Sequence, residues 1–294
     1  MVWLIDNFIT VVDGVAFGLL LFTIAIGLSL ILGVLDVLNL AHGALYLVGA
    51  YVAVQLLGGR TASMWAYLLA LIVAVVIGLG AGTGLAVMMR PLARRGHLDQ
   101  ALASLGVALV AADLLSAVFG NEVHTVPAPG FLAGKFTFLG YTYPAYRIAV
   151  ILLGLTLAVV VYLVVERTRI GALARATVVD GPMVRAMGVD TRPFVAGLFA
   201  FGTVLACVGG VMGAPILGAY PGLDQYVLIL GLVVVVVGGV DSVLGTLFGA
   251  LVIGQVEVLG VSLLPKFASF LVFATMTGAL LLRPRISRLQ AVAA

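Results

Sequence analysis

Residues 14–34 read GVAFGLLLFTIAIGLSLILGV, a run without a single Asp, Glu, Lys or Arg. About 20 apolar residues form a helix long enough to cross the hydrocarbon core of a bilayer. The same character extends over the chain, because 63% of its 294 residues are hydrophobic and only 9% are charged. A soluble domain carries about 25% charged residues, and a disordered chain needs low hydrophobicity. We therefore exclude both classes and predict a polytopic helical membrane protein.

Further apolar stretches follow one another along the whole chain, and they predict one all-α transmembrane bundle of eight or nine spans over residues 1–294. The seventh and eighth stretches, 225–240 and 243–260, are separated only by Asp241 and Ser242. They form either two spans joined by a tight turn or one broken, partly re-entrant element near 225–260, which is tolerated where it lines a cavity. The stretches are 14–34, 38–57, 65–88, 98–119, 147–165, 194–218, 225–240, 243–260 and 267–283.

The basic residues predict the orientation of these spans. Most of the 15 Lys and Arg residues fall in three clusters, and nine spans place all three clusters on the same side. The positive-inside rule puts that side in the cytoplasm. We therefore expect an external N-terminus, a cytoplasmic C-terminus, an external loop at about 120–146 and a cytoplasmic loop at about 166–193. The clusters are Arg90, Arg94 and Arg95; Arg167, Arg169, Arg175, Arg185 and Arg192; and Arg283, Arg285 and Arg288.

Motifs of enzyme chemistry are absent from the sequence. No phosphate-binding P-loop occurs, and His42, His97 and His124 have neither metal-ligand spacing nor partner cysteines. We predict a non-enzyme with no catalytic residue, no metal and no cofactor on this chain. The basic excess fits loop topology, so we expect the lipid bilayer, and not nucleic acid, as its surroundings.

Polar side chains within apolar spans are costly and therefore mark candidate functional positions. Asn39 and His42 are three residues apart and Tyr46 follows four later, so on a helix they share one face. Such a stripe either lines a translocation pathway or clamps neighbouring helices by hydrogen bonds. Asp241 and Glu257 are further pathway candidates. Ala74, Gly78 and Gly82, and likewise Gly80 and Gly84, follow a small-xxx-small spacing that lets helices approach closely.

The loop 166–193 is rich in charge and too long for a simple connector. Asp180 followed by Gly181 and Pro182 predicts the start of a short helix with Asp180 as its N-cap, and Gly188 predicts its end. Met183 and Met187 then form one apolar knob beside Arg185 and Ala186. Such a helix either docks in a groove of a soluble partner or lies at the lipid headgroups.

At these residues the sequence resembles the permease subunit of branched-chain amino acid ABC transporters, the high-affinity leucine/isoleucine/valine type. The resemblance runs from about residue 14 to 260 in family order. It is carried by Gly27-Leu28 with Leu38-Asn39-Leu40-Ala41-His42-Gly43 and Gly49-Ala50-Tyr51; by Arg167-Thr168-Arg169-Ile170-Gly171 with Arg175-Ala176, Asp180 and Ala186-Met187-Gly188-Val189; and by Gly238-Gly239 with Ser242, Gly245, Gly249, Gly254 and Glu257.

The resemblance implies one half of an ATP-driven importer in the bacterial inner membrane. It implies pairing with a second homologous permease or with itself, two cytoplasmic ATPase subunits that bind the ATP, and an external solute-binding protein. Solute would arrive at the loops 120–146 and 219–224 and cross by alternating access. The coupling residues would be Asp180, Met183, Arg185, Ala186, Met187 and Gly188.

Two departures from the family pattern concern the substrate. Residue 241 is Asp where a small residue is expected, and the polar residue expected in span four is replaced by the apolar run 107–112 followed by Asp113. Related permeases carry urea, short amides or other amino acids, so these stay alternatives. A stand-alone channel or secondary transporter for a small polar solute is the other alternative, with Asp241, Glu257 and Asp113 as candidate ion sites.

Overall fold

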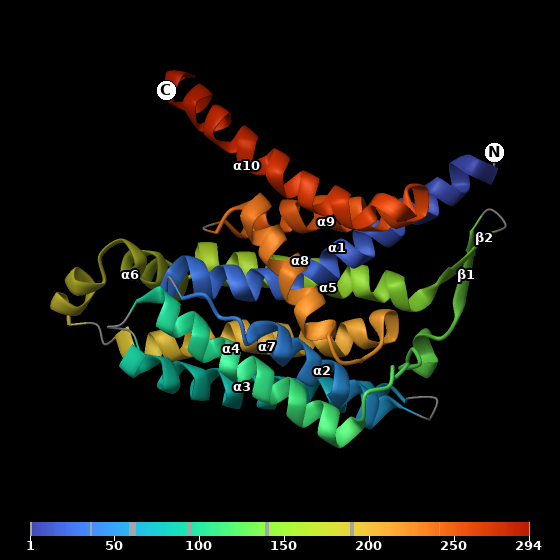
Figure 1. The fold of residues 1–294 in the computed structure, drawn as a ribbon, viewed down its shortest axis with the longest axis horizontal. Helices are drawn as coiled ribbons and strands as arrows, with labels where there is room; N and C mark the ends of the chain where they lie inside the picture. Colours follow the sequence, from blue (N-terminus) through green and yellow to red (C-terminus); the bar gives the residue numbers. More distant parts are fainter. Residues whose placement is uncertain are drawn as a thin grey trace.

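The computed structural model describes residues 2–35, 37–58, 63–92, 96–138, 141–188, 191–240 and 242–293. Most of the helices in this part of the chain run side by side in a bundle, while α10 diverges from it towards the C-terminus (Figure 1). The α-helices are α1 (Val2–Leu35), α2 (His42–Leu57), α3 (Met64–Met89), α4 (His97–Phe119), α5 (Ala145–Arg167), α6 (Arg169–Ala186), α7 (Thr191–Leu217), α8 (Leu223–Gly238), α9 (Val243–Leu263) and α10 (Ala268–Ala293).

Within the described residues, 6 helices are long and apolar enough to cross a membrane, which confirms a helical membrane bundle. Three shorter apolar helices accompany them: His42–Leu57, Leu223–Gly238 and Phe270–Leu281. The first two have 16 residues each, or about 24 Å at 1.5 Å per residue, less than the roughly 30 Å hydrocarbon core. The 6 long segments are Ile9–Gly33, Met64–Leu92, His97–Phe119, Ala145–Arg167, Pro193–Leu217 and Val243–Leu263.

Helix α1 is the centre of the bundle. Of its most apolar window, 89% is buried inside the protein, against 11% for α4 at the periphery. Helix α1 packs against α5, α7, α8 and α9, whereas α4 packs mainly against α2. Leu and Val side chains on the outer faces of α3, α4 and α5 are exposed, as expected where a helix faces lipid tails.

Small residues decide how closely α3 approaches α7. Gly78 and Gly82 both face α7, where a Cβ on Gly82 would collide with Thr203 and with the backbone of Ala200. Thr203 also donates a hydrogen bond from Oγ1 to the carbonyl of Gly78 at 2.7 Å. The Ala74, Gly78 and Gly82 face therefore packs as predicted. The second predicted face is wrong, because Gly80 and Gly84 point to open space.

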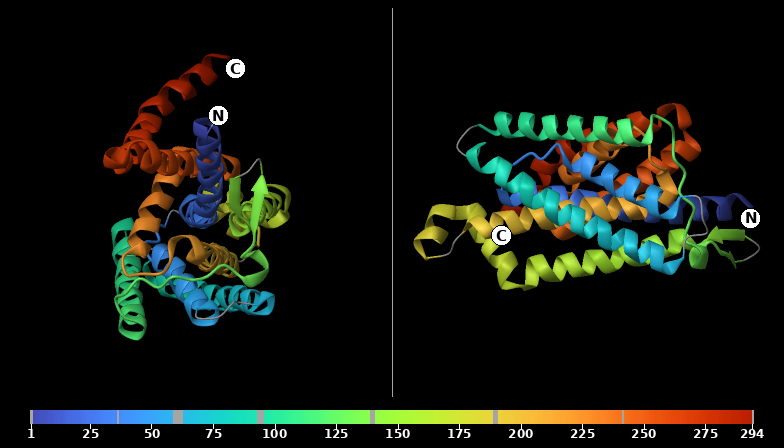
Figure 2. Two further views of the ribbon diagram at one scale, coloured as in Figure 1. Left: turned by 90° about the vertical axis from the view of Figure 1, so that its right-hand side faces the viewer. Right: turned by 90° about the horizontal axis from the view of Figure 1, so that it is seen from below.

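The segment 120–146, predicted to be an external loop, contains a β-hairpin that the all-α prediction missed. Strands β1 (Lys135–Phe138) and β2 (Tyr141–Pro144) pair antiparallel, with Phe136 opposite Tyr143. A short 3-10 helix, η2 (Gly130–Leu132), precedes them. The hairpin lies at the same end of the bundle as the N-terminal end of α1, and α6 lies at the opposite end (Figures 1 and 2).

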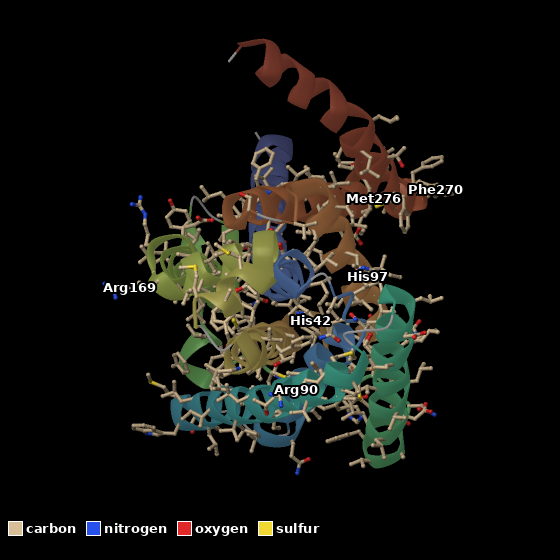
Figure 3. The ribbon with its side chains drawn as sticks, turned by 90° about the vertical axis from the view of Figure 1, so that its left-hand side faces the viewer. His42, Arg90, His97, Arg169, Phe270 and Met276 are labelled. Carbon is tan, nitrogen blue, oxygen red and sulfur yellow. The ribbon has the colours of Figure 1, made fainter. Side chains whose placement is uncertain are left out.

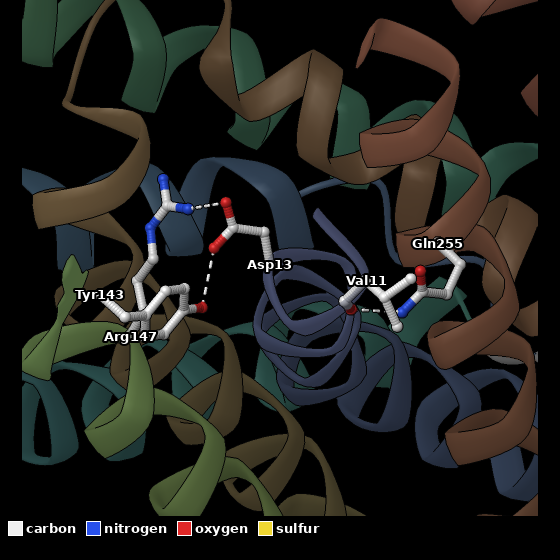
Figure 4. Close-up of polar contacts among 5 residues, drawn as sticks. All are labelled: Val11, Asp13, Tyr143, Arg147 and Gln255. Atoms are coloured by element: carbon white, nitrogen blue, oxygen red, sulfur yellow. Dashed lines mark hydrogen bonds and ion pairs between the residues drawn. The ribbon is translucent and has the colours of Figure 1, made fainter. Parts of the chain in front are cut away.

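A polar triad fixes this hairpin to the bundle (Figure 4). The Tyr143 hydroxyl donates a hydrogen bond to Asp13 Oδ1 at 2.7 Å, and Arg147 forms an ion pair with the other oxygen of the same carboxylate. Burial raises the pKa of the Tyr143 hydroxyl above its ordinary value of 10.0, and the hydrogen bond to Asp13 raises this pKa further. The triad joins α1, β2 and α5.

On the other side of α1, Gln255 of α9 donates a hydrogen bond from Nε2 to the carbonyl of Val11 at 2.7 Å (Figure 4). Its amide lies across Gly14, where a side chain would collide with it. One further turn along, Gly254 packs directly on the backbone of Gly18. Gln255, a polar residue in a predicted span, therefore fastens α9 to α1.

The region 225–260 consists of two separate helices, α8 and α9. The chain turns at Gly239, which has a φ of 92° that favours glycine. Ser242 then caps α9 by accepting a hydrogen bond from the N–H of Gly245 at 3.0 Å. The Ser29 hydroxyl of α1 donates to the carbonyl of Val240 at 2.7 Å, so the backbone of this turn is held from within the bundle.

Candidate functional site

Helix α2 begins part of the way along the bundle and not at its end (Figure 1). Its first residue, His42, contacts Ile24, which lies eleven residues before the end of α1, or about 16 Å along that helix. Residues 37–41 are therefore non-helical backbone among the packed helices. The prediction that Asn39 shares a helical face with His42 and Tyr46 is wrong, because the helix starts only after Asn39.

The backbone of this irregular segment is hydrogen-bonded by polar side chains. The Ser104 hydroxyl of α4 accepts from the N–H of Leu40 at 3.0 Å and donates to the carbonyl of Leu38 at 3.2 Å or of Ala101 at 2.9 Å. Asn39 Oδ1 accepts from the N–H of Ala41 at 3.2 Å. An unsatisfied backbone group in a membrane interior costs several kcal/mol, so these contacts explain why the interruption is stable.

His42 and Tyr46 lie between α1 and α7 and are fully buried; His42 is visible inside the bundle in Figure 3. His42 Nε2 donates a hydrogen bond to the carbonyl of Ile24 at 3.1 Å. This contact is an interhelical clamp, which was one of the two alternatives for this polar stripe. The Tyr46 hydroxyl faces Gly213 of α7, where no side chain would fit.

The three pathway candidates at the start of α2 carry polar atoms that have no hydrogen-bond partner among the described residues. Asn39 Nδ2, His42 Nδ1 and Tyr46 Oη are buried and make no hydrogen bond to any described residue. Leaving a buried polar group unpaired costs about 1–3 kcal/mol. The start of α2 therefore combines the clamp that His42 forms with buried polar atoms that the described residues leave unpaired.

Of the two remaining pathway candidates, Glu257 lies on α9. Glu257 accepts a hydrogen bond at Oε1 from the Tyr226 hydroxyl of α8 at 2.9 Å. Both side chains retain exposed surface. A charged side chain within a membrane span almost always faces the bundle interior or a water-filled cavity, because exposure to lipid is costly. Asp241 lies outside the described residues.

The loop 166–193 contains a longer helix than predicted. Helix α6 runs over 18 residues from Arg169, so the prediction of Asp180 as an N-cap is wrong. Thr168 supplies the start instead: its Oγ1 accepts from the N–H of Gly171 at 3.3 Å and its carbonyl from Ala172 at 3.1 Å. The helix is therefore already formed where the chain reaches Asp180.

The predicted end of this helix is confirmed, because Gly188 has a φ of 86°. Near that end Ala186 is exposed, Met183 is 58% exposed and Met187 is 74% exposed. The side chains of Asp180 and Arg185 lie outside the described residues. Arg169 of α6 and Arg90 lie at the same end of the bundle (Figure 3).

Three buried polar residues were not among the candidates taken from the sequence. Ser104 and Gln100 are buried polar residues of span four, about one and two turns before the apolar run 107–112. Gln100 Nε2 donates a hydrogen bond to the carbonyl of Leu92 at 3.1 Å. Asp224 was placed in an external loop, but it lies in the first turn of α8 and is 6% exposed. In the described part of the chain, no three His, Cys, Asp or Glu side chains gather as a metal site would require.

Comparison with known proteins agrees with this membrane architecture. Residues 10–280 match the family described as branched-chain amino acid transport system / permease component. The high-affinity branched-chain amino acid transport system permease protein BraD of Pseudomonas aeruginosa is 25% identical over 284 residues, covering 93% of this chain and 92% of BraD.

Two further relatives carry the same kind of name. The high-affinity branched-chain amino acid transport system permease protein LivH of Escherichia coli K12 is 25% identical over 293 residues, covering 92% of this chain and 92% of LivH. A probable branched-chain amino acid transport permease protein LivH of Methanocaldococcus jannaschii is 26% identical, covering 81% of this chain and 76% of the relative. No solved structure matches the chain significantly. Because the family match spans most of its length, the chain belongs to the family of permease components of branched-chain amino acid transport systems.

Proposed function

We propose that this chain is the permease subunit of an ATP-driven importer that moves branched-chain amino acids across a bacterial inner membrane by alternating access. The proposal is supported by the names of the relatives, which are branched-chain amino acid permeases. The absence of a P-loop in the sequence fits a motor on separate ATPase chains. In this arrangement the chain pairs with itself or with a second homologous permease and receives solute from an external binding protein.

Nine apolar helices give a consistent path through the membrane. Counting the six long segments and the three short ones, α1 runs inward, α2 returns outward, and the alternation continues until α10 runs inward. The N-terminus is then external and the C-terminus cytoplasmic. This orientation is supported by the position of α6 and its basic residues at the end opposite the hairpin (Figure 1).

The exposed end of α6 is the observation that carries the coupling assignment. Met187 is 74% exposed at the basic end of the molecule. An apolar knob on a helix fits a hydrophobic groove of a partner protein. We infer that this end of α6 contacts an ATPase subunit, so that ATP binding moves α6. The movement is then transmitted through the bundle to the irregular segment before α2. The contacting residues are Asp180, Met183, Arg185, Ala186, Met187 and Gly188.

The change Met187→Asp tests this assignment in the assembled transporter. We expect co-purification of the ATPase subunits and transport-coupled ATP hydrolysis to fall at least about tenfold, since burying an unpaired carboxylate in the groove opposes docking. Met64→Asp is the matched control, because Met64 is exposed at the start of α3 at the other end of the bundle. Intact ATPase association with Met187→Asp, or an equal loss with Met64→Asp, would refute the coupling assignment.

A further inference from the structure

Asp224 is a buried acidic residue, and no described cationic side chain forms an ion pair with it. It lies in the first turn of α8 and is 6% exposed. Its carbonyl oxygen packs against Gly43 in the first turn of α2, so the side chain starts deep between these two helices. Its carboxylate makes no ion pair or hydrogen bond with a described residue, in contrast to Asp13 with Arg147. An ionisable group in a membrane bundle is by default a functional candidate.

Aromatic rings form a wall around Tyr51, which interacts electrostatically with Asp224. The ring of Tyr51 stacks on Phe119 with centroids 4.5 Å apart, and His124 lies edge-on to both at 6.0 and 6.4 Å. Tyr51 is 1% exposed, yet its hydroxyl has no hydrogen-bond partner. That hydroxyl lies within electrostatic reach of the Asp224 carboxylate without bonding to it. The Asp224 carboxylate and the Tyr51 hydroxyl are therefore two interacting polar groups that no described residue pairs, and a group placed between them would bridge both.

The wall is held at the external side by a bridge between two loops. His124 and Ala219 exchange backbone hydrogen bonds of 2.8 and 2.9 Å, and His124 Nε2 contacts the carbonyl of Phe119 at 2.9 Å. Ala219 lies five residues before Asp224, so the same bridge fixes the approach to α8. The segment that carries His124 and the segment that leads to Asp224 are thus joined directly by this bridge.

A carboxylate, an accepting hydroxyl oxygen and aromatic faces together suit one chemical class of ligand. An ammonium group donates hydrogen bonds to the oxygens and is attracted by the rings through the cation–π interaction. We propose that Asp224 and Tyr51, with Phe119 and His124, bind the α-ammonium group of the amino acid on its way through the bundle. This inference rests on the proposed function and deepens it, because neutral urea and amides offer no cation to this site.

The test uses the assembled transporter with its ATPases and binding protein in proteoliposomes. For Asp224→Asn we expect leucine uptake to fall at least about tenfold while ATP hydrolysis stimulated by the binding protein stays within about twofold of wild type. Tyr51→Phe, which removes one oxygen, should lower uptake a few-fold. Asp99→Asn is the matched control, since Asp99 also lies in the first turn of its helix, α4, but is exposed. Unchanged uptake in Asp224→Asn, or a parallel loss of uptake and ATP hydrolysis, would overturn the proposal.

A second measurement separates this site from the import activity. The transporter without binding protein is melted in nanodiscs with 3-methylbutan-1-amine or 4-methylpentanoic acid, which keep only the amine or only the acid of leucine. We expect the amine to raise the melting temperature of wild type, less that of Tyr51→Phe, and not that of Asp224→Asn; the acid should have no Asp224-dependent effect. An amine shift that persists in Asp224→Asn, or no shift in wild type, refutes the site. If leucine is not imported but the Asp224-dependent amine shift occurs, the proposed substrate fails and the ammonium site stands.

Discussion

Replacing Ser104 by Ala should release the irregular segment that precedes α2. The substitution removes the oxygen that accepts the N–H of Leu40 at 3.0 Å and leaves that N–H without an acceptor in the bundle. A buried donor left unpaired costs about 1–3 kcal/mol. The lost hydroxyl proton adds little, because it is shared between the carbonyls of Leu38 and Ala101, and the latter lies within α4. We therefore expect a loss of about 1–3 kcal/mol in the free energy of unfolding.

The assay is an SDS unfolding titration of the purified permease in detergent, followed by circular dichroism, with uptake measured in parallel. Ser116→Ala is the matched control, because it makes the same change on the same helix at a side chain without a hydrogen bond to a described residue. We expect the control to stay within about 0.5 kcal/mol of wild type. If both variants unfold alike, Ser104 does not hold the segment and our account of the interruption is wrong.

Two further predictions concern the packing of α3 and the hairpin formed by β1 and β2. Gly82→Leu should destabilise the protein by roughly 1–3 kcal/mol through overpacking against α7, whereas Gly84→Leu, which points to open space, should be nearly neutral; equal melting temperatures of the two variants would contradict this packing. Tyr143→Phe should cost about 1 kcal/mol at pH 7. Because the pKa of Tyr143 is raised above 10.0 in the folded protein, the unfolded chain alone loses this proton above about pH 10, so wild-type stability should fall there and the Phe variant should lack this component. Parallel stability–pH curves for wild type and variant would argue against the Asp13 bond.

The membrane bundle was predictable because composition reports burial in lipid directly. A charge-free run such as 14–34 has few alternatives to a spanning helix, and the observed α1 contains it. The packing face of α3 was predictable only in part. Spacing alone describes Ala74, Gly78 and Gly82 as well as Gly80 and Gly84, and only the position of α7 distinguishes the two faces.

The interruption before α2 could not be predicted, because the residue that stabilises it is distant in sequence. Leu38, Asn39 and Leu40 fit a spanning helix by hydropathy, and the hydrogen bonds that favour irregular backbone come from Ser104. Asp224 was missed for a similar reason. After Gly222 it fits an external loop, and its burial depends on the approach of α2 at Gly43.

Local signals misled the interpretation in one place and were overlooked in another. Asp180-Gly181-Pro182 is a strong helix-start pattern, but Thr168 starts the helix earlier. The hairpin had a readable signal: two runs of alternating aromatic and polar residues, 135–138 and 141–144, are separated by two residues that include a Gly. In a chain otherwise made of spanning helices, that signal was outweighed by composition.

The most direct test of the central claim is leucine uptake into proteoliposomes with defined contents. We predict that uptake requires this permease together with its ATPase subunits, the external binding protein and ATP, and that the permease alone transports nothing. Urea and acetamide serve as competitor solutes in the same vesicles. Leucine uptake by the isolated permease without ATP, or ATP-driven uptake of urea with none of leucine, would contradict the account.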